Sequence, residues 1–310
     1  TSKSGIKAWL LNEPSIPMIA LNIGFKGASA TETDDKLGAT YLMAGLLEEG
    51  AGDMDATAFK RATERLATSF SFDSSRERIS ISAEFLSENR DASVALLKTA
   101  ITDPAFNDVA FERTKSQVLS IIARNQSDPD EIASSTFNAL AYAGHPYGRP
   151  YRGTTETVTA LTQDDLRDAH ARTMTKDRLF VGVVGDITAD ELAIMLDDLF
   201  GDLPENGAPL PTPITFQASG GTTVVDFDIP QSTAIWGHQG IGQDDPDFFA
   251  AFVMNRILGG GGFISRLTQE VREKRGLTSG VCSYMAGFDQ AVYSGGPVSP
   301  GKWTARHSIE

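Results

Sequence analysis

Residues 258–281 read L-G-G-G-G-F-I-S-R-L-T-Q-E-V-R-E-K-R-G-L-T-S-G-V, and the rest of the chain is organised around this stretch. It begins with four consecutive glycines. Glycine has no Cβ and adopts positive φ without strain, so such a run allows a tight turn or a close approach by another chain. After it, Ile264, Leu267 and Val271 fall on one helical face among charged residues. This spacing predicts an amphipathic helix from Ile264 to Lys274.

The glycine run fits neither of the two common nucleotide-binding motifs. A phosphate-binding loop requires Lys followed by Ser or Thr after its last glycine, and Phe263 stands there. A dinucleotide fingerprint requires a third glycine where this chain has Ile264. Two interpretations remain open: a mobile loop that contacts a peptide, or a helix end followed by a flexible corner. The residues concerned are Gly259, Gly260, Gly261 and Gly262.

The composition is that of an ordinary globular protein with an acidic surface. The 310 residues include 27 basic and 41 acidic side chains, which gives a net charge of −14. Nucleic acid is excluded as a partner because no cluster of Lys and Arg stands out. No apolar run approaches the roughly 20 residues of a membrane span. A single cysteine, Cys282, excludes an intrachain disulfide and is expected to be a small core side chain.

The periodicity of apolar residues predicts a chain of mixed strands and helices. The run at 179–184 is continuously apolar, which is typical of a strand that is covered on both faces. We expect strands at residues 6–11, 18–25, 70–74, 78–83 and 179–184, and helices at residues 37–47, 56–67, 89–102, 108–126, 130–142, 163–173 and 190–199, with Thr162 as the N-cap of the helix at 163–173.

A proline-rich segment divides the chain. Residues 204–213 hold four prolines and a glycine, which indicates a linker. Beyond it the opening pattern recurs with an offset near 211: the helix at 37–47 corresponds to residues 247–258, and the helix at 56–67 to residues 264–274. We therefore predict an N-terminal domain at 1–206, a linker at 207–214 and a C-terminal domain at 215–310. The fold class is α+β, a duplicated two-domain α/β sandwich with antiparallel-rich sheets, whose second domain is incomplete.

The sequence lacks the common arrangements of catalytic residues. His145, His170, His238 and His307 each stand alone, without His, Cys or Glu at the spacing that seats zinc on a helix face. No G-x-S-x-G motif is present. The neighbouring carboxylates Glu48 and Glu49 point about 100° apart on a helix, so we interpret them as a solvated helix end.

The stretch I-L-G-G-G-G-F-I-S-R-L-T-Q-E-V-R-E-K-R-G-L at 257–277 resembles the C-terminal domain of the pitrilysin/insulinase-like (M16) zinc peptidases. This family includes the mitochondrial processing peptidase and the core proteins of the cytochrome bc1 complex. Three further segments resemble the same family. They are I-P-M-I-A-L-N-I-G-F-K-G-A-S-A at 16–30, H-P-Y-G-R-P-Y-R-G-T at 145–154, and the strand and helix at 181–204.

The resemblance implies a zinc site whose residues are missing from this chain. Active members carry H-x-x-E-H on a helix, with two histidines as zinc ligands, the glutamate as general base, and a more distant glutamate as third ligand. In the alignment Tyr41 and Gly45 replace the histidines, Ala44 replaces the base, and Ile121 replaces the distal glutamate. We therefore expect no catalytic residue and no bound metal in this chain.

A second functional pair of the family is an arginine and a tyrosine seven residues later, which orient the substrate carbonyl. Arg272 matches the arginine, whereas Ser279 stands at the tyrosine position. Tyr284 is near, but its spacing is wrong, and we expect it to pack. The resemblance implies that Arg272, Ser279 and the four glycines face a bound peptide.

The resemblance also implies a function. We expect a non-catalytic subunit of a heteromeric zinc metallopeptidase, which forms part of the peptide-binding chamber with a zinc-bearing M16 subunit, or a homodimer. Zinc is then expected only in the partner, and an extended peptide is the substrate. The alternatives are a structural scaffold without substrate and, less favoured, a metallopeptidase with a rebuilt site. The bacterial periplasm or the exterior is the compartment that the resemblance suggests.

Overall fold

The computed structural model describes residues 1–229, 231–289 and 291–298, and the chain forms two compact units. Unit 1 comprises Thr1–Ile122 and Pro150–Leu210, and unit 2 comprises Ala123–Arg149 and Pro211–Glu310. The chain passes from unit 1 to unit 2 inside the proline-rich segment. Residues 123–149, which lie within the first of the two predicted domains, make their contacts in unit 2.

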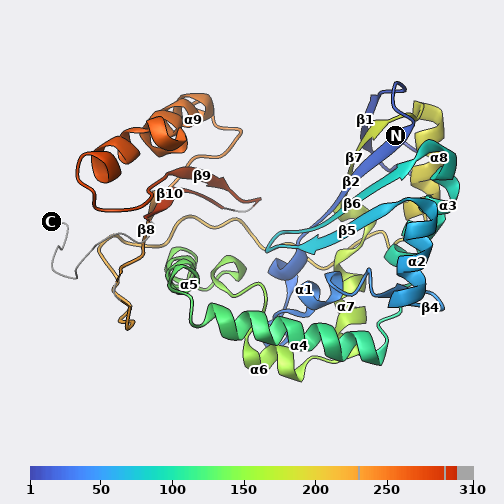
Figure 1. Cartoon of the computed structure of the whole chain (residues 1–310), viewed down its shortest axis with the longest axis horizontal. Helices are drawn as coiled ribbons and strands as arrows, with labels where there is room; N and C mark the ends of the chain where they lie inside the picture. Colours follow the sequence, from blue (N-terminus) through green and yellow to red (C-terminus); the bar gives the residue numbers. More distant parts are fainter. Residues whose placement is uncertain (230, 290, 299–310) are drawn as a thin grey trace. The chain divides into compact units, whose positions relative to one another are not determined.

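Unit 1 is built on a five-stranded sheet in the order β1-β7-β2-β6-β5 (Figure 1). The strands are β1 (Ala8–Asn12), β2 (Met18–Lys26), β5 (Ser69–Ser74), β6 (Arg78–Leu86) and β7 (Leu179–Gly185). β1 pairs with β7 in parallel, and the other pairs are antiparallel. A small hairpin of β3 (Gly50–Ala51) and β4 (Met54–Asp55) lies apart from this sheet. The predicted α+β class is confirmed.

Only one face of the sheet in unit 1 is buried. On β2, Ile19, Leu21, Ile23 and Phe25 alternate with more polar positions, and all four are buried in the core. On β7, Val184 points to the opposite face and is exposed. The expectation that the 179–184 strand is covered on both faces was therefore wrong. Antiparallel sheets commonly leave one face open, and the apolar run concealed this because its outward residues are also apolar.

Helices close the buried face of this sheet. Figure 1 shows α2 (Ala56–Leu66), α3 (Arg90–Thr102) and α8 (Ala189–Phe200) side by side, and α3 packs against both of the others. The remaining helices of unit 1 are α1 (Ala39–Ala44), α4 (Asp108–Asn125), α6 (Thr155–Ala160) and α7 (Gln163–Thr173). The predicted N-cap of α7 is confirmed, because the Thr162 side chain accepts a hydrogen bond from Asp165 N.

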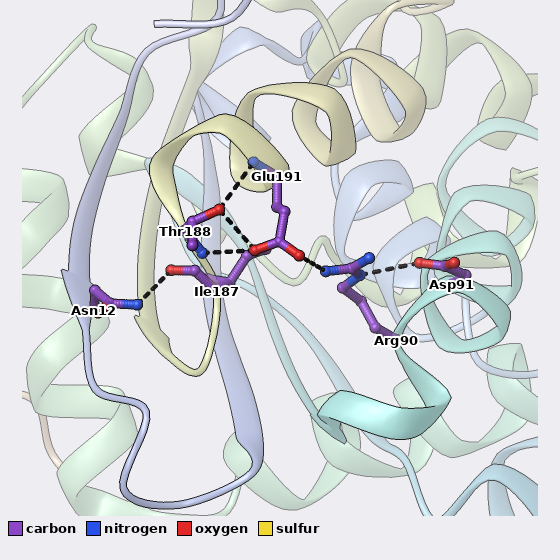
Figure 2. Close-up of polar contacts among 6 residues, drawn as sticks. All are labelled: Asn12, Arg90, Asp91, Ile187, Thr188 and Glu191. Carbon is purple, nitrogen blue, oxygen red and sulfur yellow. Dashed lines mark hydrogen bonds and ion pairs between the residues drawn. The ribbon is translucent and has the colours of Figure 1, made fainter.

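A polar network ties β1, α3 and α8 together (Figure 2). Thr188 and Glu191 form a capping box, in which the Thr188 hydroxyl donates to Glu191 at 2.6 Å. The Arg90 guanidinium of α3 donates to the other oxygen of Glu191 at 3.0 Å, and Asn12 donates to the Ile187 carbonyl at 2.7 Å. The Thr188 hydrogen bonds, followed by Arg90, lower the pKa of Glu191 to about 2. The carboxylate therefore stays ionised and fixes the start of α8.

Unit 2 contains a three-stranded antiparallel sheet in the order β8-β10-β9. The strands are β8 (Ala234–Gln239), β9 (Tyr284–Gly287) and β10 (Val292–Val298). Among its described residues this unit has two α-helices: α5 (Pro129–Ala141), which packs against β8, and α9 (Phe248–Asn255), which continues as a π-helical turn over Arg256–Gly260. In the described part of the chain, no helix is long and apolar enough to cross a membrane.

The amphipathic helix predicted at 264–274 is wrong in its start and its type. A 3₁₀ turn covers Gly262–Ile264, and π-helical backbone covers Thr268–Glu273. Ser265 has extended backbone between them, and its hydroxyl accepts a hydrogen bond from Thr268 N, so it acts as an N-cap. Ile264 precedes this cap and is exposed rather than part of a core face. A serine within an apolar pattern was the missed signal.

An aromatic cluster joins the segment around α5 to the sheet of unit 2. Phe137 of α5 lies 5.4 Å from the Tyr293 ring, and the buried Tyr142 and Tyr147 rings are 5.9 Å apart. Gly237 of β8 permits this contact, because a Cβ there would stand 2.6 Å from the Phe137 ring. Cys282 takes no part and is exposed, so its predicted core role was wrong. The bridge between Val281 and Val298 turns the neighbouring Val281 inward instead.

His145 connects the segment after α5 to the proline-rich segment. Its Nδ1 accepts a hydrogen bond from Tyr147 N at 3.2 Å, and its Nε2 lies 3.0 Å from the Thr212 carbonyl. This pair of contacts is satisfied by the neutral ring with its proton on Nε2. Burial, and then the positive charge of Arg149, lowers the pKa of His145. Protonation of Nδ1 would break the bond from Tyr147 N.

We predict that the fold loses stability as the pH falls below about 6.5, the ordinary histidine pKa. A lowered pKa in the folded state means that the neutral ring contributes stability above that value and loses it below. His145→Gln keeps one donor and one acceptor without titrating, so its melting temperature should fall less between pH 7.5 and 5.5. The same substitution at the exposed His238 is the control. Equal pH dependence of wild type and His145→Gln would contradict the assignment.

Candidate functional site

The four positions aligned with the zinc ligands and base belong to α1, the turn that follows it, and α4. Tyr41 and Ala44 lie in α1, Gly45 is the C-cap residue directly after it, and Ile121 lies on α4. A Cβ at Gly45 would stand 3.5 Å from the Thr114 side chain of α4, so the two helices are in contact there. α1 and α4 therefore pack against each other at these positions, whose side chains are not those of a zinc site.

Zinc does not fit these residues. Alanine, glycine and isoleucine have no ligating atom, and a lone phenol does not make a zinc site. The Thr114 hydroxyl is buried next to Gly45 and has no hydrogen-bond partner within the described part of the chain, and a neutral hydroxyl is a poor zinc ligand. Within the described ranges there is no group of three His, Cys, Asp or Glu side chains that could hold a metal ion.

An arginine side chain lies next to the Tyr41 ring. The Arg152 guanidinium lies 5.5 Å from the centre of the Tyr41 ring and 4.5 Å from that of Tyr151, and the two rings meet edge to face at 5.9 Å. The Nε of Arg152 is buried and has no hydrogen-bond partner among the described residues. Both arginine and tyrosine are visible in the segment at 145–154, but sequence reasoning did not connect them to Tyr41.

The segment that carries Arg152 approaches the start of α1 closely, and glycine makes this possible. Gly38 and Gly153 have φ values of 93° and 82°, and a Cβ on Gly153 would stand 2.4 Å from the Leu37 carbonyl oxygen. On the other side of this contact, a Cβ on Gly38 would stand 2.6 Å from the Arg152 carbonyl oxygen. Backbone therefore packs directly on backbone, which fixes Arg152 over Tyr41.

A buried carboxylate holds the beginning of α1. One oxygen of Glu32 accepts from Gly38 N at 3.0 Å and the other accepts from Thr40 N at 2.6 Å. Burial raises the pKa of Glu32, while these two hydrogen bonds oppose the shift. An anion at a helix start is favourable because the first amide groups have no partner in the helix. Glu32 was not among the residues that the sequence patterns indicated.

A cavity of about 660 Å³ lies where the turn after α1, α2 and the edge strand β5 meet. Glu48, Glu49 and Glu64 line it together with Lys60 and Phe70. Burial, and then repulsion by Glu49, raises the pKa of Glu48. The carboxylates predicted to be a solvated helix end thus line a cavity next to a strand with a free edge. Glu49 also pairs with Arg113 of α4.

The glycine run and Arg272 belong to unit 2. Gly259 is buried, and a Cβ there would stand 2.4 Å from the Ser283 hydroxyl, so this glycine serves close packing. A Cβ on Gly260 would stand similarly close to the Asn255 side chain, and one on Gly261 to the Arg256 backbone. Gly262, in contrast, has φ 65° and open space around it. Of the four glycines, only Gly262 therefore has the open surroundings that a loop in contact with a ligand needs.

Arg272 lies over an exposed ring. Its guanidinium is 5.0 Å from the centre of the Phe263 ring, and its Nε is 3.6 Å from a carboxylate oxygen of Glu273. Ser279 is exposed in the loop between the π-helical segment and β9. Tyr284 donates or accepts a hydrogen bond with the Tyr293 hydroxyl at 2.7 Å, in addition to a ring contact. The structure brings Arg272 next to the end of the glycine run, through Phe263.

The histidines form no site in the described part of the chain. His145 is held as described above, and the Nε2 of His170 lies 2.6 Å from the Ile101 carbonyl. Burial lowers the pKa of His170. His238 is exposed on β8, and His307 lies outside the described residues.

Comparison with protein families matches both halves of the chain. A family profile described as insulinase (peptidase family M16) matches residues 8–155, and one described as the peptidase M16 inactive domain matches residues 160–301. A protein of Helicobacter pylori named non-peptidase homolog YmxG is 29% identical over 86% of this chain. An uncharacterized zinc protease of Mycobacterium leprae is 28% identical over 91% of this chain. The chain spans 62% and 64% of these two relatives.

Solved structures agree with this similarity. A peptidase M16 inactive domain from Pseudomonas fluorescens matches 96% of this chain and 73% of its own length, with a TM-score of 0.85 and 25% sequence identity. A protease from Helicobacter pylori matches 97% of this chain and 73% of its own length with a TM-score of 0.80. Its 18% identity shows a shared fold only.

We predict that Gly153→Ala destabilises unit 1 far more than Gly5→Ala. Both glycines belong to unit 1 and have φ 82°, which costs an L side chain roughly 1–2 kcal/mol. Gly5 has open space around it, whereas a Cβ on Gly153 would clash with the Leu37 carbonyl. Denaturant unfolding of the two variants measures the difference. Equal losses would mean that the close contact between residue 153 and α1 is absent.

Proposed function

The chain belongs to the M16 peptidase family, and from this premise we propose that it is a non-catalytic subunit that forms part of a peptide-binding chamber with a zinc-bearing M16 partner. One observation carries the proposal: α1 is a buried helix, and none of the four positions that the resemblance aligns with a zinc ligand or the base has a side chain suited to that role. A chain without these groups has neither a metal-bound water nor a general base to attack an amide. Catalysis then depends on another subunit.

Three features of unit 1 support a role in peptide binding. β5 is the last strand of its sheet, so one edge of its backbone is free to pair with an extended peptide. The cavity of about 660 Å³ beside it has room for side chains of such a peptide. The outer face of the sheet is open, with Asn22 and Glu84 exposed on β2 and β6. These features suit a wall of a chamber.

The charges of the cavity favour basic peptides. Glu48, Glu49 and Glu64 line it, against Lys60 and Arg61. In unit 2, Arg272 over Phe263 and the open position at Gly262 suit contacts with the carbonyl groups of a peptide. The name of the Helicobacter pylori relative, non-peptidase homolog YmxG, is in keeping with a non-catalytic role.

We predict that the isolated chain does not hydrolyse unfolded peptides and that it increases zinc-dependent hydrolysis by a zinc-bearing M16 homologue with which it assembles. The assay uses a quenched fluorescent peptide with each protein alone and with both together, in the presence and absence of a chelator. Zinc-dependent cleavage by the pure chain would refute the proposal. A stable complex without any effect on hydrolysis and without peptide affinity would favour a scaffold instead.

We further predict that charge reversal in the cavity weakens binding of a Lys- and Arg-rich peptide. Glu48→Lys with Glu64→Lys should raise its dissociation constant by roughly 3–30-fold, because each exposed ion pair contributes up to about 1 kcal/mol. Fluorescence anisotropy of the labelled peptide measures this. Glu112→Lys, an exposed position of α4 outside the cavity, is the control. If Glu112→Lys weakens peptide binding as much as the double substitution does, or if the double substitution has no effect, the peptide does not bind in this cavity.

A further inference from the structure

Arg152 is a cation without an anionic partner in the described part of the chain. Its Nε is buried without a hydrogen-bond partner there, and its guanidinium forms no ion pair with a described carboxylate. Other partly or fully buried arginines of unit 1 have such a partner: Arg90 pairs with Glu191 at 3.0 Å, and Arg178 pairs with Asp177 at 3.2 Å. Arg152 therefore has donor capacity that its own surroundings do not use.

Two aromatic rings hold the guanidinium of Arg152 and leave its N–H groups available. The guanidinium lies over the Tyr151 ring at 4.5 Å and near the Tyr41 ring at 5.5 Å. An arginine that contacts rings in this way still carries N–H groups along its edge, and these can donate to an anion. The side chain is only partly exposed, so a hydrogen bond to it is stronger than one in open water.

The backbone on both sides of Arg152 is fixed. The glycine contact described above holds the segment against the start of α1. After it, the Thr157 hydroxyl donates to the Leu37 carbonyl at 2.9 Å and accepts from Thr154 N at 2.9 Å. A donor that is already held in place loses less entropy when a ligand binds. The cation is thus presented in a defined position.

The shape of a guanidinium favours a carboxylate as the ligand. Its planar N–H groups match the two oxygens of a carboxylate and can donate to both in parallel. A peptide supplies this group through an Asp or Glu side chain or through its C-terminal carboxylate. Phosphate sites usually collect several donors, such as successive backbone amides.

Arg152 lies at one end of the open stripe of α1 and its following turn. Between Ala39 and Glu49, every residue is buried except Tyr41, Gly45, Glu48 and Glu49. Tyr41 and Glu48 are seven positions apart, which is about 10–14 Å of α- or 3₁₀-helical backbone. Three or four residues of an extended peptide cover this length. The stripe therefore has a cation at the Tyr41 end and the carboxylates of the cavity at the other end.

We propose that Arg152, beside Tyr41 and Tyr151, binds a carboxylate group of the peptide. The inference rests on the proposed function and specifies its substrate: a carboxylate three or four residues from a Lys or Arg whose side chain enters the cavity at Glu48. In active members the resemblance places a zinc ion on this face of the helix. In this chain the same face carries a positive side chain and attracts an anion.

The test measures the anisotropy of labelled peptides that contain Lys-X-X-Glu and end in an amide. The wild-type chain should bind this peptide roughly tenfold or more tightly than its Lys-X-X-Gln counterpart, because a hydrogen bond to a charged group is lost. Arg152→Gln should remove the difference, and Arg152→Lys should keep part of it. Arg65→Gln, at an exposed arginine of α2, is the control and should keep all of it.

Two further peptides distinguish the sources of the anion. One ends in a free carboxylate three residues after Lys, and the other carries phosphoserine in place of Glu. Tighter binding of the first than of the Glu peptide would assign the site to the C-terminus of the substrate. Tighter binding of the phosphoserine peptide than of both carboxylate peptides would overturn the proposal in favour of phosphate.

An NMR titration separates this inference from the proposed function. The Nε–H signal of Arg152, identified by its loss in Arg152→Lys, is followed while sodium acetate replaces sodium chloride at constant ionic strength. A shift of this signal in a chain that binds no peptide would support the carboxylate site and contradict the peptide chamber. No shift, together with equal binding of the Glu and Gln peptides, would overturn the carboxylate site and leave the peptide chamber in place. A lower melting temperature of Arg152→Gln with an unchanged Glu-to-Gln difference would show a structural role only and also overturn it.

Discussion

Unit 1 depends on a contact between two stretches of backbone, the start of α1 and the segment around Gly153. Both sides use glycine at positive φ, because a side chain on either would meet a carbonyl oxygen of the other. Glu32 completes the arrangement by accepting hydrogen bonds from the first amides of the helix. These interactions place the Arg152 guanidinium over the Tyr41 ring of α1.

The electrostatic consequence follows from the chemistry of arginine. A guanidinium stays protonated at any pH that a protein survives. At an effective dielectric constant of about 20, a unit positive charge about 5 Å from a divalent cation costs roughly 6–7 kcal/mol. The guanidinium over Tyr41 and the absence of ligating side chains therefore both disfavour binding of a metal ion.

Sequence patterns predicted most strands and helices of unit 1, the N-cap at Thr162 and the family, because these rest on local periodicity and on motifs. They failed where a single polar residue, or a contact between residues far apart in the sequence, determines the local structure. Ser265 starts a helical segment one residue after Ile264, and the outward residues of β7 are apolar although one face of its sheet is open. The aromatic cluster that draws residues 123–149 into unit 2 and the stacking of Arg152 on Tyr41 both join residues that local patterns treat separately.

The central claim is that α1 keeps its place in the fold without the ability to bind a metal ion. The most direct measurement is anomalous diffraction at the zinc absorption edge from crystals of this chain grown with excess zinc. We expect no anomalous peak within bonding distance of Tyr41, Gly45 or Ile121, and density for the Arg152 guanidinium against the Tyr41 ring. A zinc peak between α1 and α4, held by residues of this chain, would contradict the account.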